Sequence, residues 1–225
     1  MTAKRIVLIQ GHPDSTAPHL CHALAAAYAA GAQEAGHTVR SIQVAQLDFP
    51  LLRSQHAWEE GALPAGLQQA QADIRWAEHI VLFFPLWLGD MPALLKGFLE
   101  QVARPGFAFE HEAGRATFTK KGLKGRSARV VVTMGMPALV YRWYFRAHSL
   151  KSLERNILGF VGIAPVHETL IGMVGDFKGT TAAAGWENFA GSESARNSLP
   201  KAASLIQPGT HHGKLTRLCT SHHDA

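Results

Sequence analysis

The chain has 225 residues, of which 47% are hydrophobic and 17% are charged, and its formal net charge is +5. This composition supplies enough apolar material for a buried core and excludes a disordered chain. The modest basic excess does not by itself require a nucleic-acid partner. Cys21 and Cys219 lie far apart and form neither a CxxC pair nor a disulfide framework, so we expect a reducing, cytoplasmic setting.

No segment of the sequence resembles a membrane span or an export signal. The longest apolar run, residues 80–88, contains Pro85 and falls well short of the ~20 residues that a membrane helix needs. The apolar stretch at residues 6–9 is also shorter than a secretory core of about 7–15 residues. We therefore expect a soluble protein with no stable membrane insertion.

Short apolar runs alternate with helical patterns along most of the chain. Strands are expected at residues 5–9, 39–44, 80–84, 129–133 and 169–174. Helices are expected at residues 20–35, 67–78, 92–102 and 149–160, and an irregular excursion rich in proline and glycine at residues 49–66. Pro18 is expected to open the first helix, with Ser15 or Thr16 as its cap.

This alternation predicts an α/β fold, with a parallel sheet between two layers of helices. Five strands, with a ligand loop after the first, match the flavodoxin-like three-layer sandwich and its strand order 2-1-3-4-5. Beyond residue 175 the pattern fades into glycine, alanine, serine and threonine. We expect one domain at residues 1–175 and a partly loose C-terminal extension at residues 176–225.

Ligands of a parallel sheet bind beyond the carboxyl ends of its strands, where three unusual loops are expected. The first loop, residues 11–19, places His12, Ser15 and Thr16 just before a helix. Hydroxyls and free N–H groups at a helix N-terminus suit a phosphate, although the loop also reads as an ordinary capped turn. It contains neither the GxGxxG nor the GxxxxGK[ST] pattern, which argues against a Rossmann dinucleotide site or a P-loop.

The second and third loops have compositions that suit a flat ligand. The second loop, residues 84–92, carries Trp87 among apolar residues and would contact either a flat hydrophobic ligand or a neighbouring subunit. In the third loop, residues 133–137, Gly135 would let backbone N–H groups approach a ligand. Tyr141 and His148 follow, as site residues or as packing residues.

Together these loops resemble the flavodoxin-fold NAD(P)H:quinone oxidoreductases. Residues 84–109 line up without gaps on that family's Phe-Pro-Leu-x-Trp…Pro-Ala-x-Leu-Lys-Gly…Phe-Ala-Tyr segment, and the resemblance spans about residues 5–174. It implies a dimeric flavoenzyme that transfers a hydride from NAD(P)H through flavin to a quinone or similar acceptor, with ping-pong kinetics. FMN is favoured over FAD because the excursion at residues 49–76 is shorter than in the mammalian member.

The resemblance also implies roles for individual residues. Those at the flavin phosphate and ribityl chain are His12, Ser15, Thr16, Pro18 and His19. Those against the flavin ring are Pro85, Leu86, Trp87, Leu88 and Gly89, and those at its polar edge are Thr133, Met134, Gly135 and Met136. Tyr141 matches the active-site tyrosine, which also contacts the flavin. His148 lies one residue from the position of the catalytic histidine, which Ala147 occupies.

Phe109 and His111 match positions from which a partner subunit covers the substrate, which implies a homodimer. Reduced flavin carries negative charge that fixed N–H donors at Gly135 would stabilise, and Tyr141 with His148 would either stabilise charge as the hydride moves or protonate the acceptor. No metal is expected, because the histidine pairs at residues 211–212 and 222–223 lack ligand spacing. The basic stretch at residues 115–129 is expected to be a solvated loop or to attract the phosphate of NADPH, and not to bind nucleic acid.

Two alternatives to an enzyme share this fold. A flavodoxin-type electron carrier is usually acidic, whereas this chain is basic. A regulatory ancillary subunit of a membrane transporter would need a docking surface, which the sequence does not reveal.

Overall fold

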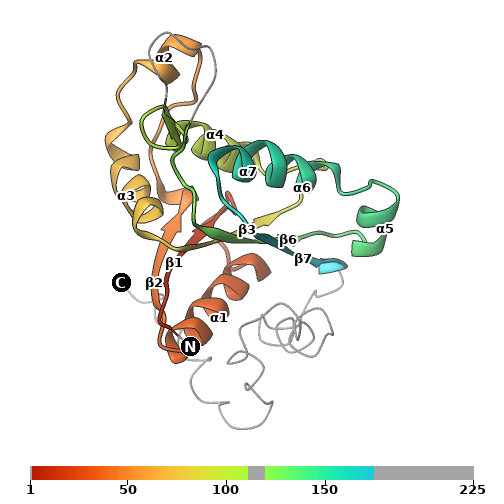
Figure 1. The fold of residues 1–225 in the computed structure, drawn as a ribbon. Coiled ribbons are helices and arrows are strands. Elements are labelled where there is room, and N and C mark those ends of the chain that lie inside the picture. Colours follow the sequence, from red (N-terminus) through yellow and green to blue (C-terminus); the bar gives the residue numbers. More distant parts are fainter. Residues whose placement is uncertain (1, 111–119, 175–225) are drawn as a thin grey trace, which may run out of the picture.

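A computed structural model describes residues 2–110 and 120–174 of the chain (Figure 1). His111 and the expected extension at residues 176–225 lie outside the described residues. The role of His111 and the domain boundary near residue 175 therefore stay predictions.

Five parallel strands form the central sheet. In spatial order they are β2 (Thr38–Gln43), β1 (Arg5–Gln10), β3 (His79–Pro85), β6 (Ser127–Thr133) and β7 (Val166–Ile171). Each neighbouring pair is parallel. Numbered among themselves, these strands run 2-1-3-4-5, so the predicted order is confirmed. The short strands β4 (Phe109–Glu110) and β5 (Lys120–Lys121), which the sequence analysis missed, form a separate antiparallel pair.

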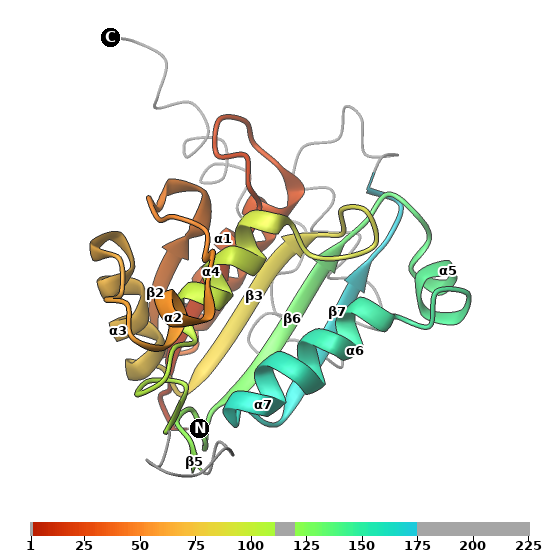
Figure 2. The ribbon, with the colours of Figure 1, turned by 90° about the horizontal axis from the view of Figure 1, so that it is seen from above.

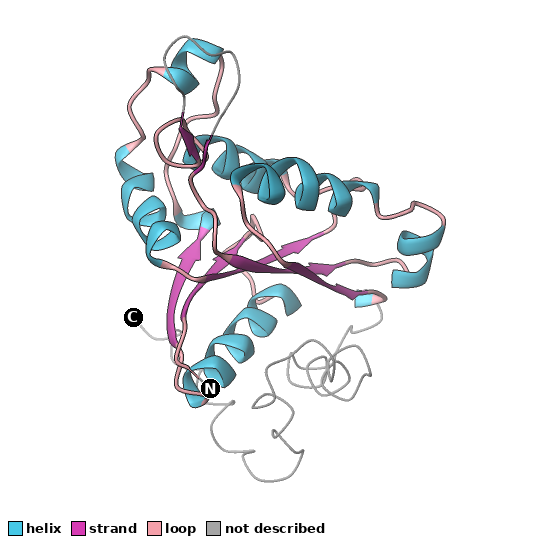
Figure 3. Cartoon of the chain, viewed as in Figure 1, coloured by secondary structure: helices cyan, strands magenta, loops and turns pink. Residues whose placement is uncertain are grey.

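Helices cover both faces of the sheet, which confirms the three-layer sandwich (Figures 1 and 3). Successive side chains of a strand point to opposite faces, so on β1 Val7 and Ile9 enter one core and Ile6 and Leu8 the other. The helix α1 (Leu20–Glu34) packs on the Ile6 side. On the Val7 side lie α3 (Gln68–Trp76), α4 (Ala93–Val102), α6 (His148–Ser152) and α7 (Gly159–Val161).

Several expected boundaries are corrected. The last strand begins three residues earlier than expected, at Val166, and ends at Ile171. The helix expected at residues 149–160 contains a π-helical stretch, Leu153–Leu158, between α6 and α7. Short helical segments also went unpredicted: η1 (Val44–Gln46), α2 (Gln55–Glu59), η2 (Ala65–Leu67) and α5 (Ala138–Trp143).

A buried arginine holds the irregular excursion against α4. Arg104 is only 7% exposed, and its guanidinium donates to the backbone oxygens of Ala57 at 2.8 Å and Gly61 at 2.7 Å. It also donates to the side-chain oxygen of Gln101. Buried polar groups are stable only when they are hydrogen-bonded, so Arg104 and these carbonyl groups constrain α2 and its flanks to one position.

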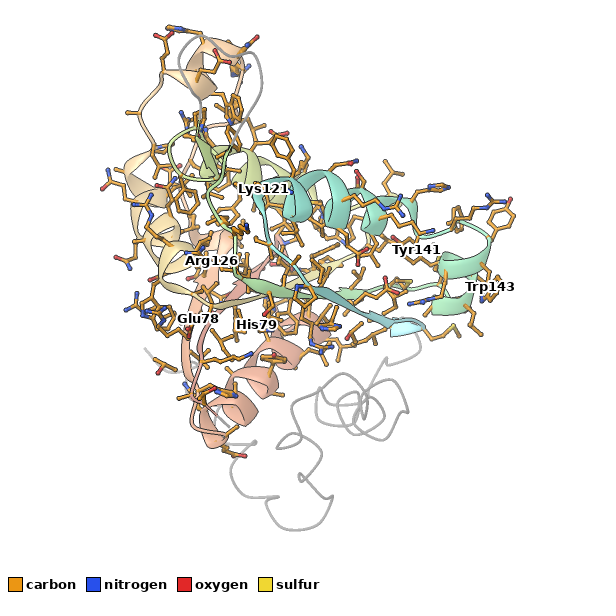
Figure 4. The ribbon with its side chains drawn as sticks, in the orientation of Figure 1. Glu78, His79, Lys121, Arg126, Tyr141 and Trp143 are labelled. Carbon is orange, nitrogen blue, oxygen red and sulfur yellow. The ribbon has the colours of Figure 1, made fainter. Side chains whose placement is uncertain are left out.

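A partly buried histidine lies at the amino end of the sheet, away from Tyr141 and Trp143 (Figure 4). The Nδ1 atom of His79 lies 2.8 Å from Oγ of Ser127. Burial, together with nearby positive groups, lowers the pKa of His79 to about 4. These groups are Arg129, Lys4, His167 and His37.

We predict that His79 makes the stability of the fold fall in mild acid. The unfolded imidazole takes up a proton below about pH 6.5, whereas the folded one does so only near pH 4. Between these values the unfolded state binds more protons, so acid favours unfolding. This difference lowers the free energy of unfolding by about 3 kcal/mol at pH 4. Urea unfolding from pH 7 to pH 4 should show a shallower loss of stability in His79→Asn than in the wild type. The exposed His56 supplies the control variant His56→Asn. If the free energy of unfolding falls equally steeply with pH in the wild type and in His79→Asn, the prediction is contradicted.

Candidate functional site

The three predicted loops meet at the carboxyl edge of the sheet. The N–H of Gly11, just after β1, donates to the carbonyl oxygen of Phe83 in β3 at 2.7 Å. The N–H of Leu86, just after β3, donates to Thr133 at the end of β6, also at 2.7 Å. In Figure 2 the arrowheads of β3 and β6 point to this edge. Each loop therefore starts from a position set by the neighbouring strand.

A fully buried glutamine fixes where the first loop leaves the sheet. Gln10, at the end of β1, is 1% exposed. Its Oε1 accepts from the N–H of His12 at 3.0 Å and from the thiol of Cys21, and its Nε2 donates to the carbonyl of Cys21 at 2.9 Å. Burial raises the pKa of the Cys21 thiol to about 12, so this residue is a neutral anchor of α1.

Three histidines gather beside this anchor. The ring of His12 stacks on that of His19 with centroids 3.9 Å apart, and the ring of His22 lies 5.2 Å from His12. Burial, reinforced by the charge of His19, lowers the pKa of both His12 and His22, so both are neutral at pH 7. A neutral imidazole still offers one N–H to an anion. The ring of His12 also lies edge-on to that of Trp87, with centroids 5.8 Å apart, which joins the first loop to the second.

Asp14 organises the first loop, although in the sequence it stands out only as a turn residue. Its Oδ1 accepts from the N–H of Thr16 at 2.8 Å and from the Thr16 hydroxyl at 2.6 Å, and its Oδ2 lies 2.8 Å from Nε2 of His19. These bonds, those from Thr16 above all, hold the pKa of Asp14 well below its usual range. The carboxylate is thus ionised, and Nε2 of His19 is the donor.

This arrangement corrects the roles expected of Ser15, Thr16 and Pro18, although α1 begins at Leu20 as predicted. The helix begins at Leu20 with His19 as its N-cap, so neither Ser15 nor Thr16 caps it, and Pro18 precedes it. The physical reason is that Thr16 is engaged by Asp14 within the loop. His22, on the first turn of α1, was missed in the sequence analysis. Its Nδ1 accepts from the N–H of His19 at 3.4 Å, in the three-residue spacing of a capping box.

The second loop raises an apolar tip above the edge of the sheet. Trp87 and Asp90 exchange two backbone hydrogen bonds, of 2.8 and 3.0 Å, around a tight turn. Both central residues, Leu88 and Gly89, have positive φ, at 49° and 82°. Leu88 is fully exposed in this unfavourable conformation, Trp87 is 48% exposed, and Pro85 is buried at the base. Strain of this kind in a non-glycine residue is typical of ligand-binding loops.

The third loop has a buried start and an open middle. Thr133 and Met134 are buried, and the N–H of Met134 donates to Ile171 of β7 at 2.8 Å. Gly135 is exposed, and a Cβ built on it would meet no atom within 4 Å. Met136 is partly buried beside it. The space above this backbone is therefore open to a ligand.

The two residues predicted to be catalytic differ in exposure. Tyr141 is 2% exposed, and its hydroxyl lies 2.7 Å from Oγ of Ser149 and accepts from the N–H of Leu150 at 3.3 Å. His148 is exposed at the start of α6. Among the hydrogen bonds of the described residues, none joins Tyr141 to His148.

Phe109 lies in the core of its own chain. It is 3% exposed, and its ring lies 5.3 Å from that of Trp58 and 5.6 Å from that of Phe160. Its strand pairs with β5, which Figure 2 places at the end of the sheet opposite the three loops. The structure therefore does not bring Phe109 to the site of its own chain, and its predicted contact with a partner's substrate stays a prediction.

Neither a metal centre nor a membrane span is found in the parts of the chain that the structure describes. Within residues 2–110 and 120–174, no group of three or more His, Cys, Asp or Glu residues can hold a metal ion. Within the same ranges, no helix has the length and apolar character needed to cross a bilayer.

Comparisons with known proteins agree with this fold. The Flavodoxin_2 family, described as having a flavodoxin-like fold, matches residues 4–189. An uncharacterised NAD(P)H oxidoreductase of Haemophilus influenzae is 32% identical over 113 residues, which cover 50% of this chain and 54% of that protein. Human ribosyldihydronicotinamide dehydrogenase [quinone] is 31% identical over 91 residues, 40% of this chain and 38% of that one. The chain therefore spans about half or less of these relatives.

Solved structures share the fold at lower identity. The NAD(P)H:quinone oxidoreductase of Methanothermobacter marburgensis has a TM-score of 0.67 and 22% identity, covering 92% of this chain and all of that one. An FMN-dependent NADH-azoreductase of Bacillus anthracis, in complex with FMN, has a TM-score of 0.61 and 18% identity, covering 89% and 98% of the two chains. The chain belongs to the Flavodoxin_2 family, and NAD(P)H:quinone oxidoreductases are among its homologues.

Proposed function

We propose that the protein is a flavin-dependent NAD(P)H oxidoreductase that passes a hydride to a quinone or similar acceptor in a ping-pong cycle. The observation that carries this proposal is the meeting of three different loops at one edge of the sheet. The first loop offers hydrogen-bond donors for an anion, the second an apolar tip, and the third open backbone. The names of the relatives and of the similar structures, which include quinone reductases and an azoreductase, support this reaction class.

The residues present fit a flavin. The Thr16 hydroxyl and N–H, with Nε2 of the N-cap residue His19, lie in the loop that precedes α1 and would hold its phosphate. Trp87 and Leu88 would cover the ring, and the backbone at Gly135 would face its polar edge. Bound flavin supplies hydride acceptance and donation, while the chain orients it and sets its charge environment. We propose FMN over FAD as the cofactor.

Tyr141 and His148 remain the proposed catalytic pair. Because the N–H of Leu150 donates to the Tyr141 hydroxyl and Ser149 lies beside it, that hydroxyl has a set orientation at the start of α6. A tyrosine held in this way can stabilise charge on the reacting partner. The exposed His148 would deliver a proton to the acceptor oxygen.

We propose that the enzyme is a homodimer acting in the cytoplasm. Around α5 the structure exposes Leu139 (69%), Trp143 (77%) and Tyr144 (80%). An exposed cluster of large apolar side chains is typical of a binding surface, which supports a subunit contact here.

The tyrosine role is tested by a matched pair of variants. Tyr141→Phe removes the hydroxyl, and we predict that it slows at least one half-reaction by about 10²-fold. Ser149→Ala removes only the neighbouring hydroxyl and should slow it much less. Stopped-flow measurement of flavin reduction and reoxidation separates the two steps. If both variants react like the wild type, Tyr141 is only a packing residue.

The visible spectrum of the purified protein tests the function itself. We predict flavin bands that bleach with anaerobic NADPH or NADH and return when menadione is added. Heat release of the cofactor and chromatography should identify FMN. Bands that neither nucleotide bleaches would indicate an electron carrier. A protein that stays colourless after FMN or FAD is added would contradict flavin binding.

A further inference from the structure

The first loop contains its own anion. The carboxylate of Asp14 takes three donors at once, namely the N–H and hydroxyl of Thr16 and Nε2 of His19. Carboxylate and phosphate oxygens are alternative acceptors for such donors, and charged acceptors bind them more strongly than neutral ones. The donors that the proposed function assigns to a flavin phosphate are therefore already occupied from within the chain.

Asp14 and a phosphate cannot share this position. The three donors converge on the two oxygens of one carboxylate, at 2.6 to 2.8 Å. Two anions within ~4–6 Å of each other repel, so an arriving phosphate disfavours the carboxylate where it now lies. The side chain is 37% exposed and that of His19 is 34% exposed, so Asp14 has a route by which to rotate into water.

We propose that Asp14 is a built-in competitor of the phosphate group of the cofactor, which closes the first loop until that phosphate displaces it. This inference rests on the proposed function, because it uses the same loop. Its consequence is a reduced apparent affinity. Only molecules in which Asp14 has released Thr16 and His19 can bind the phosphate, so the apparent dissociation constant rises as the open fraction falls.

The test compares two flavins that differ only by a phosphate. Protein freed of cofactor is titrated with FMN and with riboflavin, and quenching of flavin fluorescence reports each dissociation constant. In Asp14→Asn the amide is neutral, so it competes poorly for the donors. We expect FMN to bind about tenfold more tightly than to the wild type if about a tenth of the wild-type loops are open, with riboflavin unchanged.

Two further variants separate displacement from general charge effects. Glu100→Gln removes the same charge from an exposed position on α4, where the carboxylate pairs with Lys96. It should leave both constants unchanged. Asp14→Glu keeps the charge, but its longer side chain does not close the local turn that Asp forms with a residue two positions on. It should therefore also tighten FMN binding.

Each outcome decides the proposal. Tighter binding of FMN alone, in both Asp14 variants, supports it. Weaker or unchanged FMN binding in Asp14→Asn would show that Asp14 only positions His19, and would overturn the proposal while leaving flavin binding intact. If FMN binds more tightly to Asp14→Asn but binds to Asp14→Glu as to the wild type, the effect is charge repulsion alone, and the displacement proposal is overturned. If neither flavin binds to any form, the proposed function fails and this inference fails with it.

Discussion

The parallel hydrogen bonding of β1, β3 and β6 is the constraint on which the site depends. Their central residues are buried on both faces, so the strands lie at the centre of the sheet and end along one edge. The bonds from Gly11 to Phe83 and from Leu86 to Thr133 continue the pairing one residue past the strands. Three loops of unrelated composition therefore start from one rigid line, although they lie far apart in the sequence.

Polar groups then set the shape of the first loop. Gln10 is buried and fully engaged, so it holds the entry of the loop and the start of α1 together. Asp14 does the same for the exposed part of the loop, but with bonds that solvent can reach. Because Gln10 is buried and the contacts of Asp14 are open to solvent, the loop can keep its position while its hydrogen-bond donors exchange one acceptor for another.

The sequence predicts the sheet well because strands buried on both faces are continuous apolar runs with turn residues at their ends. It predicts the three loops because they follow those runs. It does not predict α2, because a segment rich in proline and glycine is ordered here by the distant Arg104. Asp14 in a turn reads as an ordinary turn residue. The Tyr141 hydroxyl contacts Ser149 and Leu150 of α6, and no local sequence pattern reveals this contact.

A crystal structure of the full chain with FMN tests the central claim most directly, because that claim concerns one ligand spanning three loops. We predict that the phosphate lies at residues 11–19, with Asp14 turned away from Thr16. The ring should lie between Trp87 and the backbone of Gly135. FMN bound elsewhere on the chain, or a phosphate that does not touch the first loop, would contradict the account.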